Sequence, residues 1–294
     1  MPAAHAPLLV EAAPAKINLT LRVVGRRADG YHEIESLVAF ARLGDGVTLT
    51  PGAPLGLDVR GPFASRAGRT ADNLVLKAAR ELARRVDALA LGRFVLDKRL
   101  PVAAGLGGGS ADAAAALRLL AAANDLAPDD PRLLAAARAT GADVPVCLDP
   151  RPRIMRGIGD VLSAPLDLPP LPVVLINPGV PLATRDVFAA FAAGAPAPGA
   201  AIDVAATRLD SLRAVLDALA GAANDLEPAA VSLCPAVADV LAALARTGSC
   251  RLARMSGSGA TCFGLFDSER AAEAAARSLR GVQRAWWVRA SVLG

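Results

Sequence analysis

The sequence predicts an α+β protein of two domains, and three observations lead to that fold class. The chain has 294 residues, a length that suits about two domains. Short alternating apolar segments typical of strands are interspersed with alanine- and leucine-rich segments typical of helices. Proline and glycine become frequent over residues 150–172, where we expect the connection between the domains. We therefore divide the chain into residues 1–163 and residues 164–294.

The composition excludes several classes of function. The chain is 53% hydrophobic and 20% charged, so it can bury a large core. The net charge is only +4 and the basic residues are dispersed, so we expect no nucleic-acid partner. No segment has the character of a membrane span or a secretory signal, which predicts a cytoplasmic protein that binds no membrane. The four cysteines form no C-x-x-C pair, so we expect buried thiols and no metal site.

Residues 14–23 alternate between apolar and polar side chains, which predicts a strand with one buried face. Lys16 and Asn18 would project from the same side of this strand, about 7 Å apart. The two side chains either form part of a site or lie on a solvated strand face.

The turn over residues 26–33 contains Asp29-Gly30, a dipeptide typical of β-hairpins. Tyr31 and His32 follow directly. An aromatic ring beside an imidazole suits stacking on, and hydrogen bonding to, a flat heterocycle. The alternative is a surface turn with a half-buried ring.

Residues 100–115 hold four glycines within five positions, followed by a serine and an alanine run. A glycine loop that leads into a helix N-terminus exposes several N–H groups, which predicts an anion site, most often for phosphate. We expect Ser110 to be the N-cap of the helix, which should end near Asn124. The loop matches neither a Walker motif nor a dinucleotide fingerprint. A flexible turn before a helix is the alternative.

The other elements follow from periodicity and from capping residues. Residues 94–99 form a strand that delivers Lys98 to the glycine loop, and a helix opens at Asp72 or Asn73 and runs to about residue 86. Asp143 comes just after the helix that Gly141 ends, where a negative charge opposes the helix dipole, so it is either a turn residue or a functional one. Further strands are expected over residues 47–50, 55–59, 173–176, 251–255, 261–266 and 285–292, and further helices over 130–140, 184–191, 209–220, 237–246 and 268–280.

Two small-residue loops, two lysines and one aspartate together fit a single chemistry. A phosphate-rich ligand needs backbone N–H groups and lysines, which the loops, Lys16 and Lys98 would supply. A transferred phosphoryl group also needs an acceptor hydroxyl held in line near a carboxylate, for which Asp143 is the candidate. The sequence therefore favours nucleotide-dependent phosphoryl transfer.

Five segments resemble the GHMP kinase superfamily, and they occur in the same order along the chain. The Ala-Asp-Gly-Tyr-His and Gly-Ala-Asp-Val-Pro segments narrow the resemblance to members that phosphorylate the 2-hydroxyl of a cytidine diphosphate-linked methylerythritol in non-mevalonate isoprenoid biosynthesis. The resemblance implies a ribosomal-protein-S5-domain-2-like N-terminal domain that binds ATP, a ferredoxin-like C-terminal domain that contributes to the substrate site, and an active site between them. The segments are residues 14–19, 27–32, 101–111, 141–145 and 255–260.

The resemblance also implies roles for individual residues. Asp143 would orient the attacking hydroxyl and accept its proton late, and Lys16 would stabilise charge beside it. The expected ATP-binding residues are Asn73, Lys98, Pro101, Ala103, Ala104, Gly105, Leu106, Gly107, Gly108, Gly109, Ser110 and Ala111. The expected substrate-binding residues are Asn18, Tyr31, His32, Thr184, Phe188, Gly257, Ser258, Gly259 and Ala260, with Tyr31 and Phe188 on opposite faces of the cytosine and His32 at its edge. Mg²⁺ is expected with ATP, Ser110 being the one ligand candidate, and the protein is expected to be a monomer or a weak homodimer.

Two alternatives remain open at this point. One is another small-molecule kinase of the superfamily that acts on homoserine or mevalonate, although neither substrate explains the adjacent tyrosine and histidine. The other is a non-catalytic nucleotide-binding regulator, which would need neither Lys16 nor Asp143.

Overall fold

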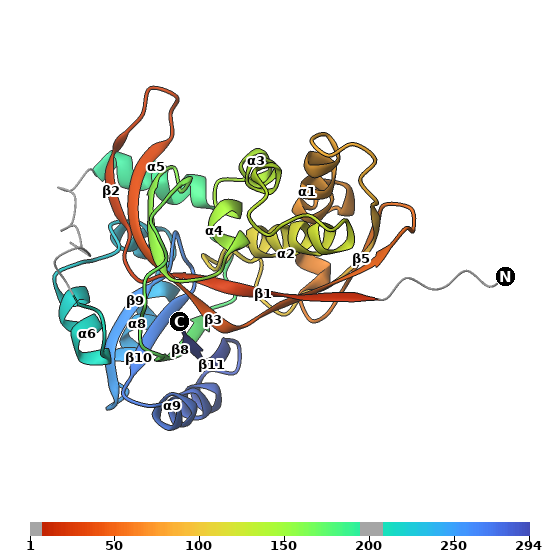
Figure 1. The fold of residues 1–294 in the computed structure, drawn as a ribbon. Coiled ribbons are helices and arrows are strands. Elements are labelled where there is room, and N and C mark those ends of the chain that lie inside the picture. The colour runs from red at the N-terminus through yellow and green to blue at the C-terminus, as the bar shows by residue number, and fades with distance from the viewer. Residues whose placement is uncertain (1–7, 195–207) are drawn as a thin grey trace. The chain divides into compact units, whose positions relative to one another are not determined.

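The computed structural model describes residues 8–194 and 208–294 (Figure 1). These residues form two compact units. Of the described residues, the first unit contains those up to Ala15 together with Gly44–Val102 and Gly107–Pro150. The second contains Lys16–Leu43, Ala103–Leu106 and the described residues from Arg151 onward. The sequence predicts a loose tail over residues 1–7 and a low-complexity loop over residues 194–200. All of these residues except Gly194 lie outside the described residues. The predicted division into an ATP-binding domain of residues 1–163 and a substrate-site domain of residues 164–294 stays a prediction.

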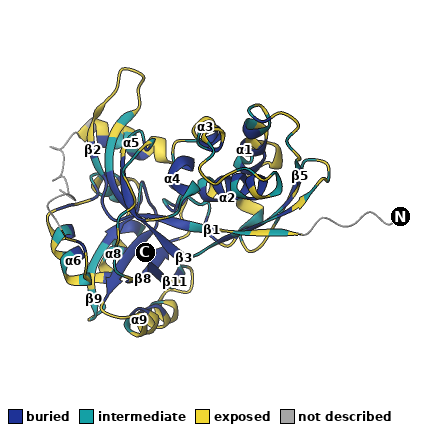
Figure 2. Cartoon of the chain, viewed as in Figure 1, coloured by how far each residue is buried: buried dark blue, intermediate teal, exposed yellow. Residues whose placement is uncertain are grey.

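The first unit packs helices beside a small sheet. Residues 46–51 of β3 pair antiparallel with β5, and β5 pairs parallel with β4. The helix α1 packs against α2 and α3, and α2 also packs against α4. Most of α2 is buried (Figure 2), and the buried residues are mainly alanines, whose small side chains allow the neighbouring helices to approach closely. The elements are β1 (Leu9–Asn18), β3 (His32–Pro51), β4 (Gly56–Arg60), β5 (Gly92–Asp97), α1 (Leu74–Ala83), α2 (Gly108–Ala123), α3 (Pro131–Thr140), α4 (Val144–Leu148) and the short 3₁₀ helices Ala64–Arg66 and Thr70–Asp72; β1 and β3 also extend into the second unit.

The starts of three helices test the capping predictions. The side chain of Asn73 accepts a hydrogen bond from the Val75 N–H, and Asp130 caps α3 ahead of a proline, so both predicted caps are confirmed. The prediction for Ser110 is wrong, because α2 begins at Gly108 with Gly107 as its N-cap. Gly107 has a φ of 60°, a left-handed conformation that glycine adopts readily and that starts the helix before the serine is reached.

Asp143 lies just after the end of α3, as expected, but it also lies at the start of a second helix that the sequence did not predict. The helix α3 ends at Gly141, and Asp143 is the N-cap residue of α4. The Val144 N–H donates to the Gly141 carbonyl at 3.1 Å, so the chain turns directly from one helix into the next. A carboxylate at a helix start is favourable, so the opposition between Asp143 and the dipole of α3 is offset by α4.

The second unit is built on a sheet with the order β3-β11-β8-β10-β9. The strand β8 is a continuous run of buried residues, as expected for the centre of a sheet. The helix α8 packs on β9 and β10, and α9 packs on β8, β10 and β11. The predicted succession of strand, strand, helix and strand near the C-terminus is confirmed by β9, β10, α9 and β11. The elements not yet named are β2 (Arg22–Arg26), β6 (Arg153–Gly157), β7 (Val161–Leu162), β8 (Leu171–Asn177), α5 (Thr184–Gly194), α6 (Leu212–Ala220), α7 (Glu227–Leu233), α8 (Ala236–Ala245), β9 (Cys250–Met255), β10 (Cys262–Phe266), α9 (Glu269–Val282) and β11 (Trp287–Leu293).

The single strand predicted over residues 14–23 is two strands. β1 ends at Asn18 and β2 begins at Arg22. Between them, the N–H groups of Leu19 and Thr20 both donate to the Leu37 carbonyl, at 2.8 and 3.4 Å. One carbonyl that accepts from two successive N–H groups interrupts the regular ladder of hydrogen bonds, so the strand breaks here. The alternation of apolar and polar residues continues across this break, and the sequence pattern therefore does not reveal it. The predicted hairpin between β2 and β3 is confirmed.

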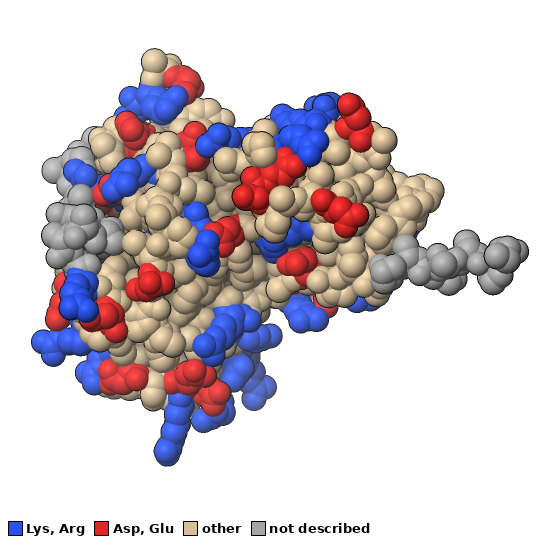
Figure 3. Space-filling model, viewed as in Figure 1, with Lys and Arg blue, Asp and Glu red and all other residues tan. Residues whose placement is uncertain are grey.

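The surface and the thiols agree with the composition. Positive and negative side chains are mixed over the visible face (Figure 3). Three of the four cysteines are buried and Cys250 is half-buried. Among residues 8–194 and 208–294, no helix combines the length and the apolar character that a membrane crossing requires.

Candidate active site

Two small-residue segments far apart in the sequence meet in the second unit. The Ser256 hydroxyl donates to the Gly105 carbonyl at 2.9 Å, and the Thr261 N–H donates to the Ala104 carbonyl at 3.1 Å. A Cβ atom on Gly105 would lie only 2.3 Å from the Ser256 carbonyl oxygen. The two backbones therefore approach each other more closely than any side chain would allow, which explains the glycine at position 105.

The end of β1 joins this contact. The Asn18 N–H donates to the Ser256 hydroxyl at 3.1 Å, and the Asn18 amide donates to the Ser36 hydroxyl at 2.7 Å. The Lys16 N–H donates to the Leu106 carbonyl at 2.9 Å. Lys16 and Asn18 are only 4% and 3% exposed, which excludes the alternative of a solvated strand face.

Asn224 holds the small-residue loop of residues 256–260 from its other side. Its side-chain amide donates to the Met255 and Gly257 carbonyls, both at 2.8 Å, while its oxygen accepts from the Leu226 N–H at 3.0 Å. The Thr184 and Ser258 hydroxyls lie 2.8 Å apart, so two of the expected substrate-binding residues contact each other. Sequence reasoning missed Asn224, because an asparagine in a loop carries no sign of its distant partners.

Replacing Asn224 by aspartate should loosen this loop. The variant keeps an oxygen for the Leu226 N–H but sets a second oxygen against two carbonyl oxygens that have lost their donor. We expect unfolding free energy to fall by about 2–4 kcal/mol, because buried carbonyls without donors are costly. Calorimetry or chemical unfolding measures this loss.

The matched control is Asn124→Asp. Asn124 also donates to two carbonyls, those of Ala90 and Leu120, but its contacts with Ala90 are exposed to solvent. Water can replace these bonds, so the control should lose less stability. Equal losses in the two variants would contradict the special role of Asn224.

The side chain of His32 stacks on Phe188 in the second unit. The ring centroids are 4.8 Å apart and the planes are inclined by 23°. Burial and the nearby Arg26 charge lower the pKa of His32, so the imidazole is neutral at pH 7 and can both donate and accept. Tyr31 at the hairpin is 61% exposed, which leaves its ring face accessible. The structure thus brings His32 and Phe188 together.

The first unit holds a buried group of three charges beside the start of α2. The Lys98 ammonium lies 2.5 Å from Asp45 and 2.6 Å from Asp112, and all three side chains are at most 5% exposed. Burial alone would lower the pKa of Lys98, but the two carboxylates raise it above its usual value. Burial raises the pKa of Asp112 to about 7; the Lys98 charge opposes this rise, and the Asp45 charge adds to it. Neither aspartate was predicted from the sequence to be part of a site.

Comparisons with known proteins agree with one another. The family model for the GHMP kinases N terminal domain matches residues 73–149, and the GHMP kinases C terminal model matches residues 202–284. The 4-diphosphocytidyl-2-C-methyl-D-erythritol kinases of Xanthobacter autotrophicus and Methylobacterium radiotolerans are 58% and 59% identical to the chain, and each match covers 96% of this chain and 97% of the relative. The chain belongs to the GHMP kinases.

Solved structures support the same GHMP kinase fold, which is the two-domain α+β fold that the sequence predicted. A crystal structure of 4-(cytidine 5'-diphospho)-2C-methyl-D-erythritol kinase matches with a TM-score of 0.75 and 37% identity, over 97% of this chain and 99% of that one. The homoserine kinase of Cytophaga hutchinsonii matches with a TM-score of 0.71 at 20% identity, over 99% and 96% of the two chains, which shows a shared fold alone.

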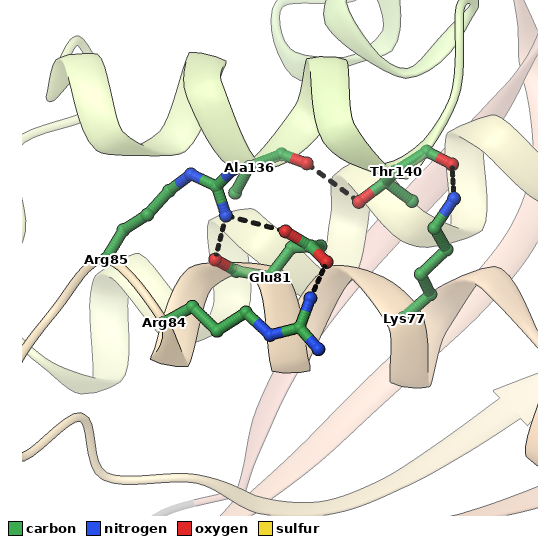
Figure 4. A network of polar contacts seen from close by, with 6 residues as sticks. All are labelled: Lys77, Glu81, Arg84, Arg85, Ala136 and Thr140. Carbon is green, nitrogen blue, oxygen red and sulfur yellow. Dashed lines mark hydrogen bonds and ion pairs between the residues drawn. The ribbon is translucent and has the colours of Figure 1, made fainter.

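In this GHMP kinase, the turn that carries Asp143 is anchored by α1 (Figure 4). The Lys77 ammonium donates to the Thr140 carbonyl at 2.7 Å, and the Thr140 hydroxyl donates to the Ala136 carbonyl at 2.8 Å. This contact fixes the last residue of α3 three positions before Asp143. On the same helix Glu81 binds Arg84 and Arg85, and the Arg85 hydrogen bond lowers the pKa of Glu81.

The remaining predicted residues of the kinase divide between the two units. Lys16 and the loop of residues 256–260 lie in the second unit, whereas Asp143 lies in the first. The approach of Lys16 to Asp143 therefore stays a prediction. In the first unit, Asn73 caps α1, Gly107 caps α2, and Gly108–Ala111 form the first turn of α2.

Proposed function

We propose that this GHMP kinase transfers the γ-phosphoryl group of ATP to the 2-hydroxyl of 4-diphosphocytidyl-2-C-methyl-D-erythritol, giving the 2-phosphate and ADP. One observation carries the proposal: relatives that bear this kinase name are 55–59% identical over nearly the whole chain. The reaction belongs to non-mevalonate isoprenoid biosynthesis. The proposal includes a cytoplasmic enzyme that acts as a monomer or a weak homodimer on a small-molecule substrate.

ATP would bind through backbone groups. The first turn of α2 follows a glycine cap that offers no side chain to its N–H groups, so these groups and the positive end of the helix dipole suit a polyphosphate. Pro101, Ala103–Leu106 and Gly107–Ala111 would form the phosphate loop, and Asn73 would lie along the adenosine.

The cytidyl substrate would bind on the second unit. The exposed Tyr31 ring offers a stacking face for cytosine, and the neutral His32 imidazole can serve a base edge that presents both donors and acceptors. Phe188 would cover the other face of the base. Asn18, Thr184 and the loop Gly257–Ala260 would contact the substrate's phosphates and hydroxyls.

Asp143 and Lys16 would act on the acceptor alcohol. Phosphoryl transfer passes through a loose transition state, so the hydroxyl proton leaves late and positioning dominates. Asp143 would orient the hydroxyl by accepting its hydrogen bond and then take the proton. Lys16 would stabilise the negative charge on the transferred group.

Mg²⁺ would come to the site with ATP. In the part of the chain that the structure describes, no group of three or more His, Cys, Asp or Glu side chains could hold a metal ion. Mg²⁺ commonly binds through substrate phosphates and only one or two protein groups, which is compatible with this lack of a cage.

Incubation with ATP, Mg²⁺ and the cytidyl diphosphate substrate tests the proposal. Mass spectrometry should detect one added phosphate on the substrate together with ADP. Homoserine and mevalonate, offered at the same concentration, should give no product. Phosphorylation of either alcohol in preference to the cytidyl substrate would contradict the proposal, and ATP binding without any product would favour a regulator.

Replacing Tyr31 by alanine should weaken binding of the cytidyl substrate and leave binding of ATP unchanged. Stacking of a base on an aromatic ring contributes about 1–3 kcal/mol, so we expect KM for the cytidyl substrate to rise on the order of tenfold. KM for ATP should change less than twofold. The control Tyr31→Phe keeps the ring and should behave as the wild type; a tenfold effect of that variant would place the hydroxyl, and not the ring, in the site.

A further inference from the structure

Lys98 has little left with which to bind a nucleotide. Its ammonium is held by Asp45 and Asp112, and its side chain is 5% exposed. Its backbone is also engaged: its N–H donates to the Arg60 carbonyl at 2.7 Å, and its carbonyl accepts from the Phe63 N–H at 3.1 Å. A direct contact with ATP would have to break part of this arrangement. The environment of Lys98 therefore argues for an indirect role.

The three charges join the segments that lead into the helix start. Asp45, on β3, accepts hydrogen bonds from the N–H groups of Arg99 and Leu100 through one oxygen and from Lys98 through the other. Asp112 lies on α2, about one turn after its start, and accepts from the same ammonium. Lys98 is thus the one link between the chain after β5 and the first turns of α2 within this group.

The ammonium lies directly against the first residue of α2. A Cβ atom added to Gly108 would be 3.2 Å from Nζ of Lys98. The position of the helix start therefore depends on where the carboxylates hold the ammonium. Since backbone N–H groups of this turn would grip the ATP phosphates, a shift of a few tenths of an ångström would alter the grip.

Stability of the fold alone does not explain the composition of this group of three charged residues. Two buried carboxylates share one cation, and Oδ1 of Asp112 is buried without a hydrogen-bond partner within the described residues. Such a buried, unsatisfied oxygen is costly, and apolar side chains of similar size would often stabilise a fold as well or better. A cost of this kind calls for a reason other than stability.

We propose that Asp45, Lys98 and Asp112 are positioning residues, which hold the start of α2 in the geometry that binds the ATP phosphates, and that Lys98 acts through the helix and not by contact with ATP. This inference rests on the proposed function and changes the role expected for Lys98 within it. It predicts that Asp112, which would never touch ATP, is as important for ATP as Lys98.

Two variants and their combination test the proposal. Asp112→Asn is isosteric and removes the charge that faces Lys98, whereas Lys98→Met removes the ammonium and keeps a similar length. Each is expected to raise KM for ATP about tenfold and to leave KM for the cytidyl substrate within twofold of wild type. The double variant should lose no more ATP affinity than either single variant, because the two residues act as one link.

The opposing outcomes are distinct. A tenfold effect of Lys98→Met with no effect of Asp112→Asn would mean that Lys98 contacts ATP directly. Lower thermal stability with unchanged KM for ATP in both variants would mean a purely structural group. Either result would overturn the proposal. If Lys98→Met does not fold, the isosteric Asp112→Asn decides alone, since an unchanged KM for ATP in that variant contradicts the link.

A control and a second readout keep the test independent of the reaction. Asp58→Asn breaks an exposed ion pair with Arg93 in the same unit and should change neither KM. Calorimetric binding of a non-hydrolysable ATP analogue should show the same tenfold losses as the kinetics. If the wild type fails to phosphorylate the cytidyl substrate, the proposed function fails, but the analogue still reports on Lys98 and Asp112.

Discussion

Replacing Asp143 by asparagine is expected to lower kcat at least a hundredfold, while the affinities for ATP and for the cytidyl substrate stay near those of the wild type. The amide keeps the size of the carboxylate and its place at the start of α4, so the fold should be unchanged. It cannot accept the hydroxyl proton, and it orients the alcohol less well. A hundredfold loss corresponds to about 3 kcal/mol in the activation barrier.

The measurement is steady-state kinetics with both substrates, together with calorimetric binding. Asp129→Asn makes the same chemical change at an exposed position of the same unit and should leave kcat unaltered. Turnover of Asp143→Asn within a few fold of wild type would contradict the assigned role.

A double-mutant cycle with Lys16→Met extends this prediction. If Asp143 and Lys16 act on the same alcohol, kcat of the double variant should fall by much less than the product of the two single reductions. Either change alone already disables their joint action on the alcohol. Fully multiplicative losses would indicate that the two side chains work separately.

Gly105→Ala should have the second large effect, on both stability and activity. Gly105 has a φ of +74°, and a methyl group there would lie 2.3 Å from the Ser256 carbonyl oxygen and 2.9 Å from that of Gly259. Both contacts are with backbone, so one of the two segments must move. We expect thermal stability to fall markedly and kcat/KM to fall at least a hundredfold, since both segments are expected to border phosphates.

The variant Gly52→Ala separates the effect of backbone conformation from the effect of the close contact with Ser256. Gly52 has nearly the same φ, +76°, but a Cβ atom there would meet nothing within 4 Å. The free energy of unfolding of Gly52→Ala should fall by only about 1–2 kcal/mol, the strain of the left-handed conformation, and its activity should be preserved. Equal behaviour of the two variants would show that backbone conformation, and not the close approach to Ser256, accounts for the effect.

Local features of the fold could be predicted from the sequence. Asn73 and Asp130 act as caps through bonds to residues two positions away, so local chemistry determines them. The C-terminal succession of β9, β10, α9 and β11 also followed from periodicity. Ser110 failed as a cap because a positive φ at Gly107 outweighs side-chain capping preference.

The residues of the site that the sequence did not predict depend on partners that are distant along the chain. Asp45, Asp112 and Asn224 gain their importance from burial and from bonds to residues 14 to 55 positions away, which local patterns do not reveal. Asp112 did leave one signal, a carboxylate inside a run of alanines that no solvated helix face explains. The grouping of Lys16–Leu43 with the chain after Arg151 had no local signal at all.

The strand β3 has a consequence for how the chain is made. Ala41 pairs with Leu293, and the Phe40 carbonyl accepts from the Gly294 N–H at 3.1 Å, so residues synthesised early wait for residues synthesised late. On the ribosome, this edge of β3 remains open until β11 has emerged. Nascent chains should therefore stay sensitive to protease around residues 40–43, and chaperones should engage them, until β11 has been synthesised.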